Sequence, residues 1–145
     1  MKKKRPKSSL HTLLNISEIK ENDAVRLLVT AQKVVDENQK KLNELEVFLA
    51  DYQHQPKTPV HAHRLQSTRQ FLIQLSEVIQ LQKQQLELSK CAMLKEKDNW
   101  IARRIKRKSV EKIAHNRFLK IEKAKQKKEE AELDEMSSQF KTPFL

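Results

Sequence analysis

The chain contains 145 residues with a mass of 17.1 kDa, which is enough for one domain of ordinary size. Charged residues make up 34% of it, aromatic residues 5%, and glycine is absent, which excludes glycine-rich nucleotide-binding loops and disfavours the tight turns of a β-sheet. The formal net charge of +11 favours a partner that carries negative charge: nucleic acid, an anionic membrane or an acidic protein surface.

Prolines divide the chain into two long stretches rich in helix-forming residues. In chain order we expect a basic disordered arm (1–8), a helix (9–53), a turn (54–58), a second helix (59–136) and a disordered tail (137–145). Thr58 and Pro59 suit the cap and the first position of the second helix. The sequence therefore predicts a single all-α domain.

Apolar residues recur every seven positions in both predicted helices. The first helix has a row broken only by Glu21 and a second row beside it: Leu14, Leu28, Val35, Leu42, Leu49, and Leu10, Ala24, Ala31, Leu45, Tyr52. The second helix has one unbroken row: Leu65, Leu72, Ile79, Leu86, Met93, Trp100. Such sustained heptads are typical of coiled coils, and a short turn makes neighbouring helices antiparallel. We therefore predict a long antiparallel two-helix coiled-coil hairpin.

The second helix is predicted to extend beyond the first. Pairing across the predicted turn places Leu10 near Ile101, so that the chain beyond about residue 106 lacks a partner. The apolar row continues there, interrupted by Arg107, Arg117 and Lys128. Either ion pairs within the helix, such as Lys125 with Glu129, hold this extension, or another molecule accepts it.

Positive charge gathers at the end of the hairpin away from the turn. Residues 8–94 are neutral overall, whereas residues 1–7 carry +5 and residues 95–130 carry +8. Because like charges repel, this end of the hairpin is best explained as a surface that docks on an acidic partner.

A second apolar stripe lies near the predicted turn. In the second helix it consists of Phe71, Leu75, Val78 and Gln82, spaced as one helical face. A matching row in the first helix consists of Lys41, Leu45, Phe48 and Tyr52. Exposed apolar rows indicate a partner surface, and aromatic residues are favoured anchors. The alternative is a wide core in which Leu45 and Leu75 are simply buried.

We expect neither an enzyme, nor a cofactor, nor a metal site. His54, His61 and His63 lie near the turn without the spacing or companion ligands of a metal site, and the single Cys91 lies among core positions. No stretch is long and apolar enough to span a membrane, and no secretory signal follows the basic start. Nucleic acid is disfavoured as a specific partner because Phe118 is the only aromatic residue between 101 and 139.

The chain resembles the FliJ family, small coiled-coil proteins of the bacterial flagellar export apparatus, over almost its whole length. The resemblance shows in Leu10-His-Thr-Leu13, Asp23-Ala-Val-Arg-Leu-Leu28, Arg69-Gln-Phe-Leu-Ile-Gln-Leu75, Gln84-Gln-Leu86, Trp100 and Leu133-Asp-Glu135. The order and spacing of these segments carry it.

The resemblance implies a non-enzymatic stalk, located in the cytoplasm and peripherally associated with the export apparatus at the inner membrane, that serves flagellum assembly and motility. Family members dock into the hexameric export ATPase with the end that carries both termini, promote its assembly and activity, and bind the export gate protein FlhA and certain export chaperones. The implied gate contact is Phe71, Leu75, Val78, Gln82, Lys41, Leu45, Phe48 and Tyr52. The implied ATPase contact is the basic group Arg103, Arg104, Lys106, Arg107, Lys108 and Arg117.

Three alternatives stay open at this point. The first is the equivalent stalk of a virulence type III secretion system, which has the same fold. The second is a basic coiled-coil protein that binds nucleic acid through its phosphates. The third, a helix lying on a membrane surface, is disfavoured because the apolar face of residues 95–130 is narrow.

Overall fold

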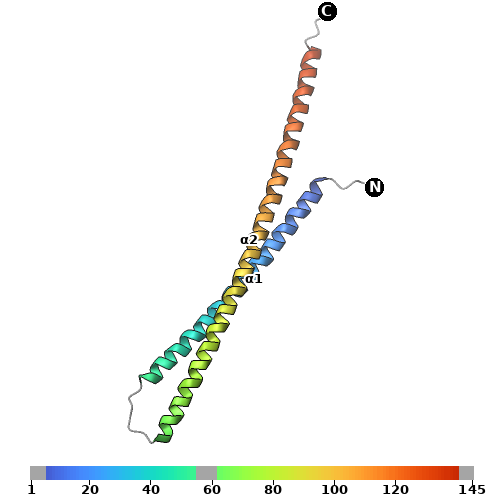
Figure 1. The fold of residues 1–145 in the computed structure, drawn as a ribbon. Helices are drawn as coiled ribbons and strands as arrows, with labels where there is room; N and C mark the ends of the chain where they lie inside the picture. Colours follow the sequence, from blue (N-terminus) through green and yellow to red (C-terminus); the bar gives the residue numbers. More distant parts are fainter. Residues whose placement is uncertain (1–5, 55–61, 141–145) are drawn as a thin grey trace, which may run out of the picture. The chain divides into compact units, whose positions relative to one another are not determined.

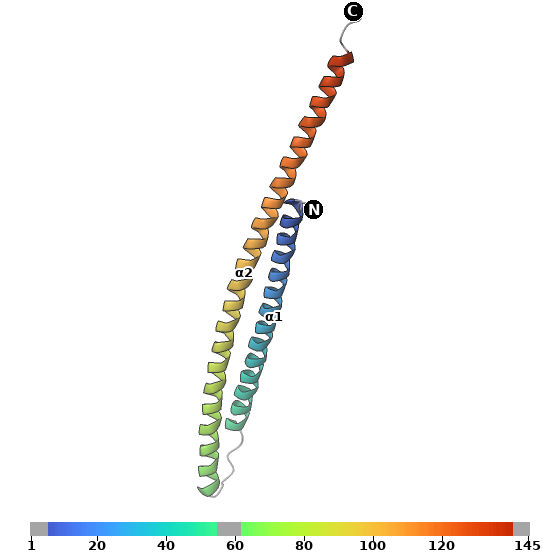
Figure 2. The same cartoon turned by 90° about the vertical axis from the view of Figure 1, so that its right-hand side faces the viewer.

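The computed structural model describes residues 6–54 and 62–140, which form two long helices (Figures 1 and 2). Helix α1 spans Pro6–Gln53 and helix α2 spans Ala62–Phe140, with no strand among these residues. No glycine or internal proline interrupts either helix, and Pro6 occupies a first helical position, where its missing N–H has no partner to lose. The predicted all-α helical hairpin is confirmed.

Both helices differ slightly in their bounds from those predicted. Helix α1 begins at Pro6 instead of residue 9, and α2 continues to Phe140 instead of ending at residue 136, because the next proline comes only at Pro143. The last turn of α1 is closed by the His54 N–H, which donates to the Ala50 carbonyl at 3.0 Å. The predicted Thr58 cap and most of the predicted turn lie outside the described residues.

Packing divides the chain into two compact units, each containing parts of both helices: residues 22–102, and residues 1–21 with 103–145. In the first unit, a core of five buried residues joins the helices: Val35, Leu42, Leu75, Ile79 and Leu86. Leu45, Leu49 and Met93 pack against this core. Its members fall on heptad positions of each helix, as the sequence predicted for all of them except Leu75.

The helices of the first unit pair in a register different from the predicted one. Gln82 donates from Nε2 to the Asn38 carbonyl at 3.0 Å and to Asn38 Oδ1 at 3.2 Å, whereas the predicted register placed Asn38 opposite about residue 73. The partner of Asn38 thus lies about nine residues further along α2 than predicted, and the later start of α2 at Ala62 instead of residue 59 accounts for only part of this shift. Leu65, a predicted core residue, is 52% exposed because it precedes the part of α2 that α1 covers.

In the second unit, the start of α1 packs against α2 beyond Ala102. Ser17 and Val110 are buried there, and Ala114 is half-buried. Beyond Ala114 the heptad positions, including Ile121 and Ala131, are exposed. In Figures 1 and 2 α2 continues past the start of α1. The predicted extension of α2 therefore exists, although it starts after Ala114 instead of residue 106. We call residues 115–140 the overhang.

Candidate partner-binding surfaces

Three aromatic side chains cluster near the ends of α1 and α2 that face the turn. Phe71 of α2 meets Phe48 and Tyr52 of α1, with ring centroids 6.2 and 4.9 Å apart, and the Phe48 and Tyr52 rings are 6.4 Å apart. Phe48 is 50% exposed and Phe71 is 37% exposed. These contacts stabilise the hairpin and still leave aromatic surface for a partner, which is the combination expected of a binding anchor.

The predicted gate-contact row divides into a buried part and an exposed part. Leu75 is 8% exposed and belongs to the core, Leu45 packs against that core, and Gln82 is half-buried in its bond to Asn38. The stripe at Leu75 and Gln82 is therefore the second heptad row of α2, which corrects the prediction that these side chains form an outward face. The alternative of a wide core holds for Leu45 and Leu75.

The exposed part lies along one flank of the coiled coil. It comprises Lys41, Phe48, Phe71 and Val78, with the half-buried Tyr52 at its end. We call these five residues the flank patch. Lys41, Phe48, Phe71 and Val78 each directly precede a residue of the core row, which is the g position of the heptad. In an antiparallel coiled coil the g positions of both helices lie on the same side, and the contact between Phe48 and Phe71 shows that they do so here.

The same flank carries two further exposed apolar residues that were not predicted as site residues. Leu27 and Val34 are 52% and 43% exposed and precede Phe48 at whole-heptad spacing in α1. Their heptad spacing was visible in the sequence. Only the structure shows that these side chains lie at the exposed edge of the core.

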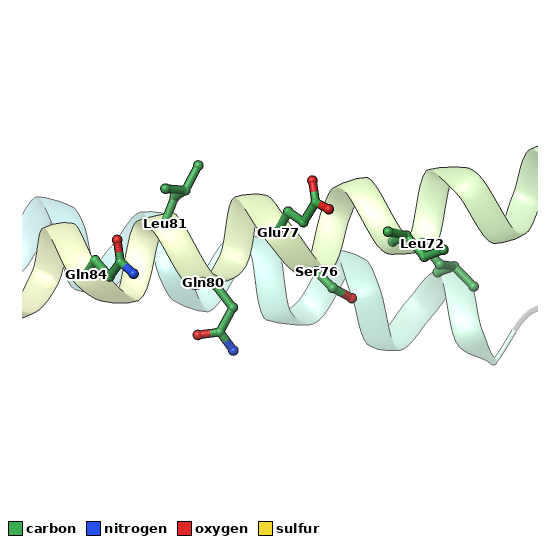
Figure 3. A pocket seen from close by; sticks show the side chains of 7 residues that line it. Leu72, Ser76, Glu77, Gln80, Leu81 and Gln84 are labelled. Carbon is green, nitrogen blue, oxygen red and sulfur yellow. The ribbon is translucent and has the colours of Figure 1, made fainter.

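An open pocket of about 650 Å³ lies on α2 alone (Figure 3). It is lined by Leu72, Ile73, Ser76, Glu77, Gln80, Leu81 and Gln84. Figure 3 shows Leu81 and Glu77 projecting to one side of the helix and Ser76 and Gln80 to the other. A shallow surface of one helix does not shelter a reaction, so this pocket offers at most a contact face.

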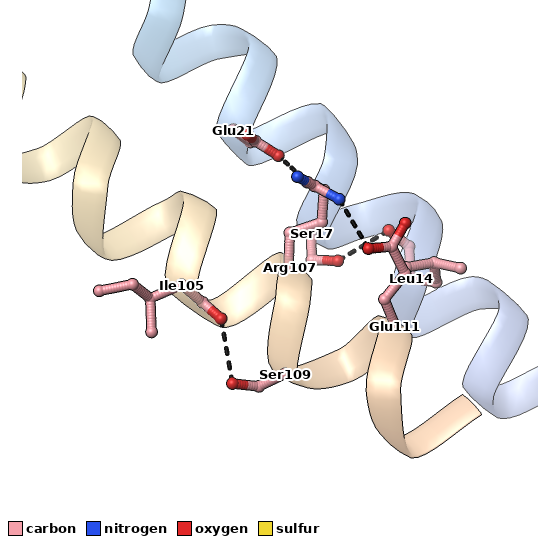
Figure 4. Close-up of polar contacts among 7 residues, drawn as sticks. All are labelled: Leu14, Ser17, Glu21, Ile105, Arg107, Ser109 and Glu111. Carbon is pink, nitrogen blue, oxygen red and sulfur yellow. Dashed lines mark hydrogen bonds and ion pairs between the residues drawn. The ribbon is translucent and has the colours of Figure 1, made fainter. Parts of the chain in front are cut away.

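In the unit that contains the start of α1, an ion pair crosses from one helix to the other (Figure 4). The Arg107 Nε–H donates to the Glu21 carboxylate, and Arg107 also donates from an η nitrogen to Glu111 at 2.8 Å. The hydrogen bond to Glu21 is the main cause that raises the pKa of Arg107 above its ordinary value. Glu21 and Arg107 each interrupt an apolar row, and the structure places these two interruptions against each other.

The predicted ATPase contact is only partly available for a partner. The pairing of Arg107 with Glu21 and Glu111 commits its side chain within the chain. Arg103 is half-buried and lines a small pocket with Lys106 and α1 residues such as Lys20. The remaining predicted contact residues are exposed: Arg104, Lys106, Lys108 and Arg117.

Other candidate sites find no support in the described residues. No group of three or more His, Cys, Asp or Glu side chains there is arranged to hold a metal ion. Of the predicted histidines, His61 and the side chain of His63 lie outside the part of the chain that the structure describes. No helix within the ranges 6–54 and 62–140 is long and apolar enough to cross a membrane. Cys91 is exposed, whereas its place among core positions had suggested burial.

The comparison with protein families gives a match along both helices. Residues 6–140 match the family described as Flagellar FliJ protein, in agreement with the resemblance found from the sequence. No curated protein and no solved structure matches the chain. The family is one of structural export-stalk proteins and is not a known enzyme family. The chain therefore belongs to the Flagellar FliJ protein family and is a component of the flagellar export apparatus.

Proposed function

We propose that this protein is a cytoplasmic stalk that docks in the ring of the export ATPase, promotes its assembly and activity, and links the ring to the export gate. The observation that carries this proposal is the overhang, a continuation of α2 that the start of α1 leaves uncovered. An isolated charged helix is marginal in water, so an uncovered helix of this length is best explained by a partner that receives it.

The charge near the start of α1 supports docking on an acidic surface. Arg104, Lys106, Lys108 and Arg117 are exposed, and Arg103 and Lys20 line one pocket beside Lys106. Their mutual repulsion lowers stability at low salt, and acidic groups of a partner would relieve it. The hexameric export ATPase, similar to FliI, is the partner that the family suggests for this end. Arg107 is left out of the contact because it is paired internally.

The flank patch is the proposed contact for the export gate protein, which is similar to FlhA. Its exposed aromatic and aliphatic side chains belong to both helices, so the contact requires the folded hairpin. Three of the residues implied by the family resemblance, Leu45, Leu75 and Gln82, are left out of the proposed contact. Leu45 and Leu75 pack in the core, and Gln82 is bonded to Asn38. Export chaperones are further proposed partners, and association with the membrane would occur only through these proteins.

The ring-docking proposal is tested by the ATPase activity of the cognate export ATPase, measured with and without this protein and combined with electron microscopy of rings. We expect higher activity and more hexamers. The variant Arg104→Glu with Lys108→Glu should lose this effect while keeping its helical content by circular dichroism. Phe71→Ala with Val78→Ala is the matched control, since these substitutions leave the basic surface intact. Full stimulation by the charge-reversed variant would refute the assignment.

The gate-contact proposal is tested by swimming motility in a strain that carries only the variant protein. Phe71→Ala with Val78→Ala should abolish motility and leave ATPase stimulation unchanged. The control Ile73→Ala with Leu81→Ala removes similarly exposed apolar side chains from the pocket on α2 and should leave cells motile. Normal swimming of the flank-patch variant, or equal loss in both variants, would contradict the assignment.

A further inference from the structure

The overhang is divided into a basic half and an acidic half. Residues 115–128 contain six Lys or Arg residues and a single acidic residue, Glu122. Residues 129–135 contain five acidic residues and no basic one: Glu129, Glu130, Glu132, Asp134 and Glu135. All of these side chains are exposed except the half-buried Glu122. The overhang thus presents two blocks of opposite charge along one helix.

Neither block is neutralised by its own helix. Among the described residues the ion pairs lie outside 115–140, at Arg26, Lys90 and Arg107. The order of charges is also unfavourable, because intrahelical pairs are stronger when the acid precedes the base. The last turn of α2 contains no basic residue that could pair with the acidic block. The acidic block is therefore open to cationic side chains of another molecule.

An apolar stripe accompanies the charges. Leu133, Met136 and Phe140 follow one another at helical spacing on one face, and Phe118 lies on the same face because it precedes Met136 by five helical turns of about 3.6 residues. These four side chains are between 53% and 85% exposed. Between Phe118 and Leu133 the same face carries Glu122, Lys125 and Glu129. A helix that paired with another one through this face would therefore make charge contacts in the middle and apolar contacts towards both ends.

We propose that the overhangs of two copies of this protein pair with each other in antiparallel orientation. A parallel pair would place like charges side by side, whereas an antiparallel pair places each basic block beside an acidic one. With the pair centred between Lys128 and Glu129, Lys123 lies opposite Asp134 and Lys125 lies opposite Glu132. Phe118 then faces the segment between Met136 and Phe140. The interface is two-fold symmetric, so each contact occurs twice.

This inference stands independently of the proposed docking in the ATPase ring, because it concerns the protein alone. If the docking proposal also holds, the two states exclude each other, since both cover the overhang. Pairing would then keep the free protein in a storage form that ring assembly dissociates.

Sedimentation equilibrium of the full chain tests the pairing over a series of concentrations up to about 100 μM, at low salt and at about 0.5 M salt, where screening weakens exposed charge pairs. We expect a dimer that dissociates at high salt. Lys123→Glu with Lys125→Glu and Lys127→Glu should weaken dimerisation at least about tenfold, because attraction becomes repulsion at several pairs. Glu130→Lys with Glu132→Lys and Asp134→Lys should do the same. A mixture of these two variants should form the heterodimer.

The matched control is Lys83→Glu with Lys95→Glu and Lys97→Glu, which changes the net charge as the first variant does but lies outside the overhang. It should dimerise at least as well as the unchanged protein, since it lowers the overall repulsion. Circular dichroism checks that every variant keeps its helices. A monomer at all concentrations, dimers in both overhang variants, or a mixture that stays monomeric would each overturn the proposal.

Discussion

Leu75 and Val78 lie within one turn of α2, and the same substitution to alanine should destabilise the protein strongly at Leu75 and only slightly at Val78. Leu75 is 8% exposed in the core, whereas Val78 is 47% exposed on the flank patch. Leucine-to-alanine substitutions in cores cost about 2–5 kcal/mol. A two-helix core opens to solvent on both sides, so we place Leu75→Ala at about 2–3 kcal/mol, the lower end of that range. Val78→Ala should change the free energy of unfolding by about 0.5 kcal/mol or less.

Urea denaturation followed by circular dichroism measures both changes, and motility measures the functional outcome. Leu75→Ala should lower the urea midpoint clearly, so any loss of motility in that variant reports weaker packing of the hairpin. Val78→Ala should impair motility with a much smaller shift of the midpoint. Adding Phe71→Ala should abolish motility but also lower the midpoint, because the ring contacts with Phe48 and Tyr52 are lost. For this reason Phe71→Ala with Leu75→Ala, which the sequence alone suggests as a gate-contact variant, is a poor test. Equal midpoints for Leu75→Ala and Val78→Ala would refute the division into buried and exposed residues.

Three further predictions concern the polar contacts and the overhang. Gln82→Ala should cost about 0.5–1.5 kcal/mol in urea denaturation, because Asn38 loses its partner across the hairpin. The pKa of Arg107 is higher in the folded protein than in the unfolded chain. The stability that its charge contributes is therefore fully present below the pKa of the unfolded chain and is lost only as the pH rises through the pKa of the folded protein. Thermal unfolding between about pH 8 and 10 should accordingly show no loss of the contact with Glu21. A chain ending at Glu122 should keep its urea midpoint, because residues 123–140, which it lacks, are all exposed, and it should lose ATPase stimulation, because most of the overhang is removed.

The helices and the core rows of α1 could be predicted from the sequence because they follow from local rules. Helix-forming composition, the positions of the prolines and the heptad spacing of residues such as Val35 and Leu42 depend only on neighbours in the chain. The structure confirms both rows, with Leu45 and Leu49 packed against the core as their spacing indicated. The existence of the overhang was predictable for the same reason, since the second helical stretch is much longer than the first.

The register could not be predicted because it depends on where α2 begins and on contacts between distant residues. The observed pairing is shifted by about nine residues of α2 from the predicted one, so that Leu65 is exposed and Asn38 meets Gln82. The division of the second apolar stripe into buried and exposed residues could not be predicted for a related reason. Leu75 and Gln82 are spaced like Phe71 and Val78, and only the position of α1 decides which pair faces inward. The exposure of Cys91, in contrast, follows from spacing alone, because Cys91 lies on the face of α2 opposite Leu86 and Met93.

The polar residues within the core rows are explained once the register is known. Buried Ser17 and Ser89 each donate to the carbonyl three residues earlier, at 2.8 and 2.7 Å, so that they need no partner from the other helix. Gln82 and Arg107 do need such partners, and they meet Asn38 and Glu21.

Sliding α2 by one heptad would preserve most apolar contacts, because every row repeats after seven residues. It would however leave Gln82 and Arg107 opposite apolar positions, where each half-buried polar group would lose its partner on the other helix. Apolar heptads therefore make the two helices pair, and the polar interruptions select one alignment among several that the apolar rows alone would allow. That alignment places Phe48 beside Phe71, and it leaves residues 115–140 beyond the last half-buried core residue, Ala114. Both proposed partner surfaces thus depend on Gln82 and Arg107, the polar residues that interrupt the apolar rows.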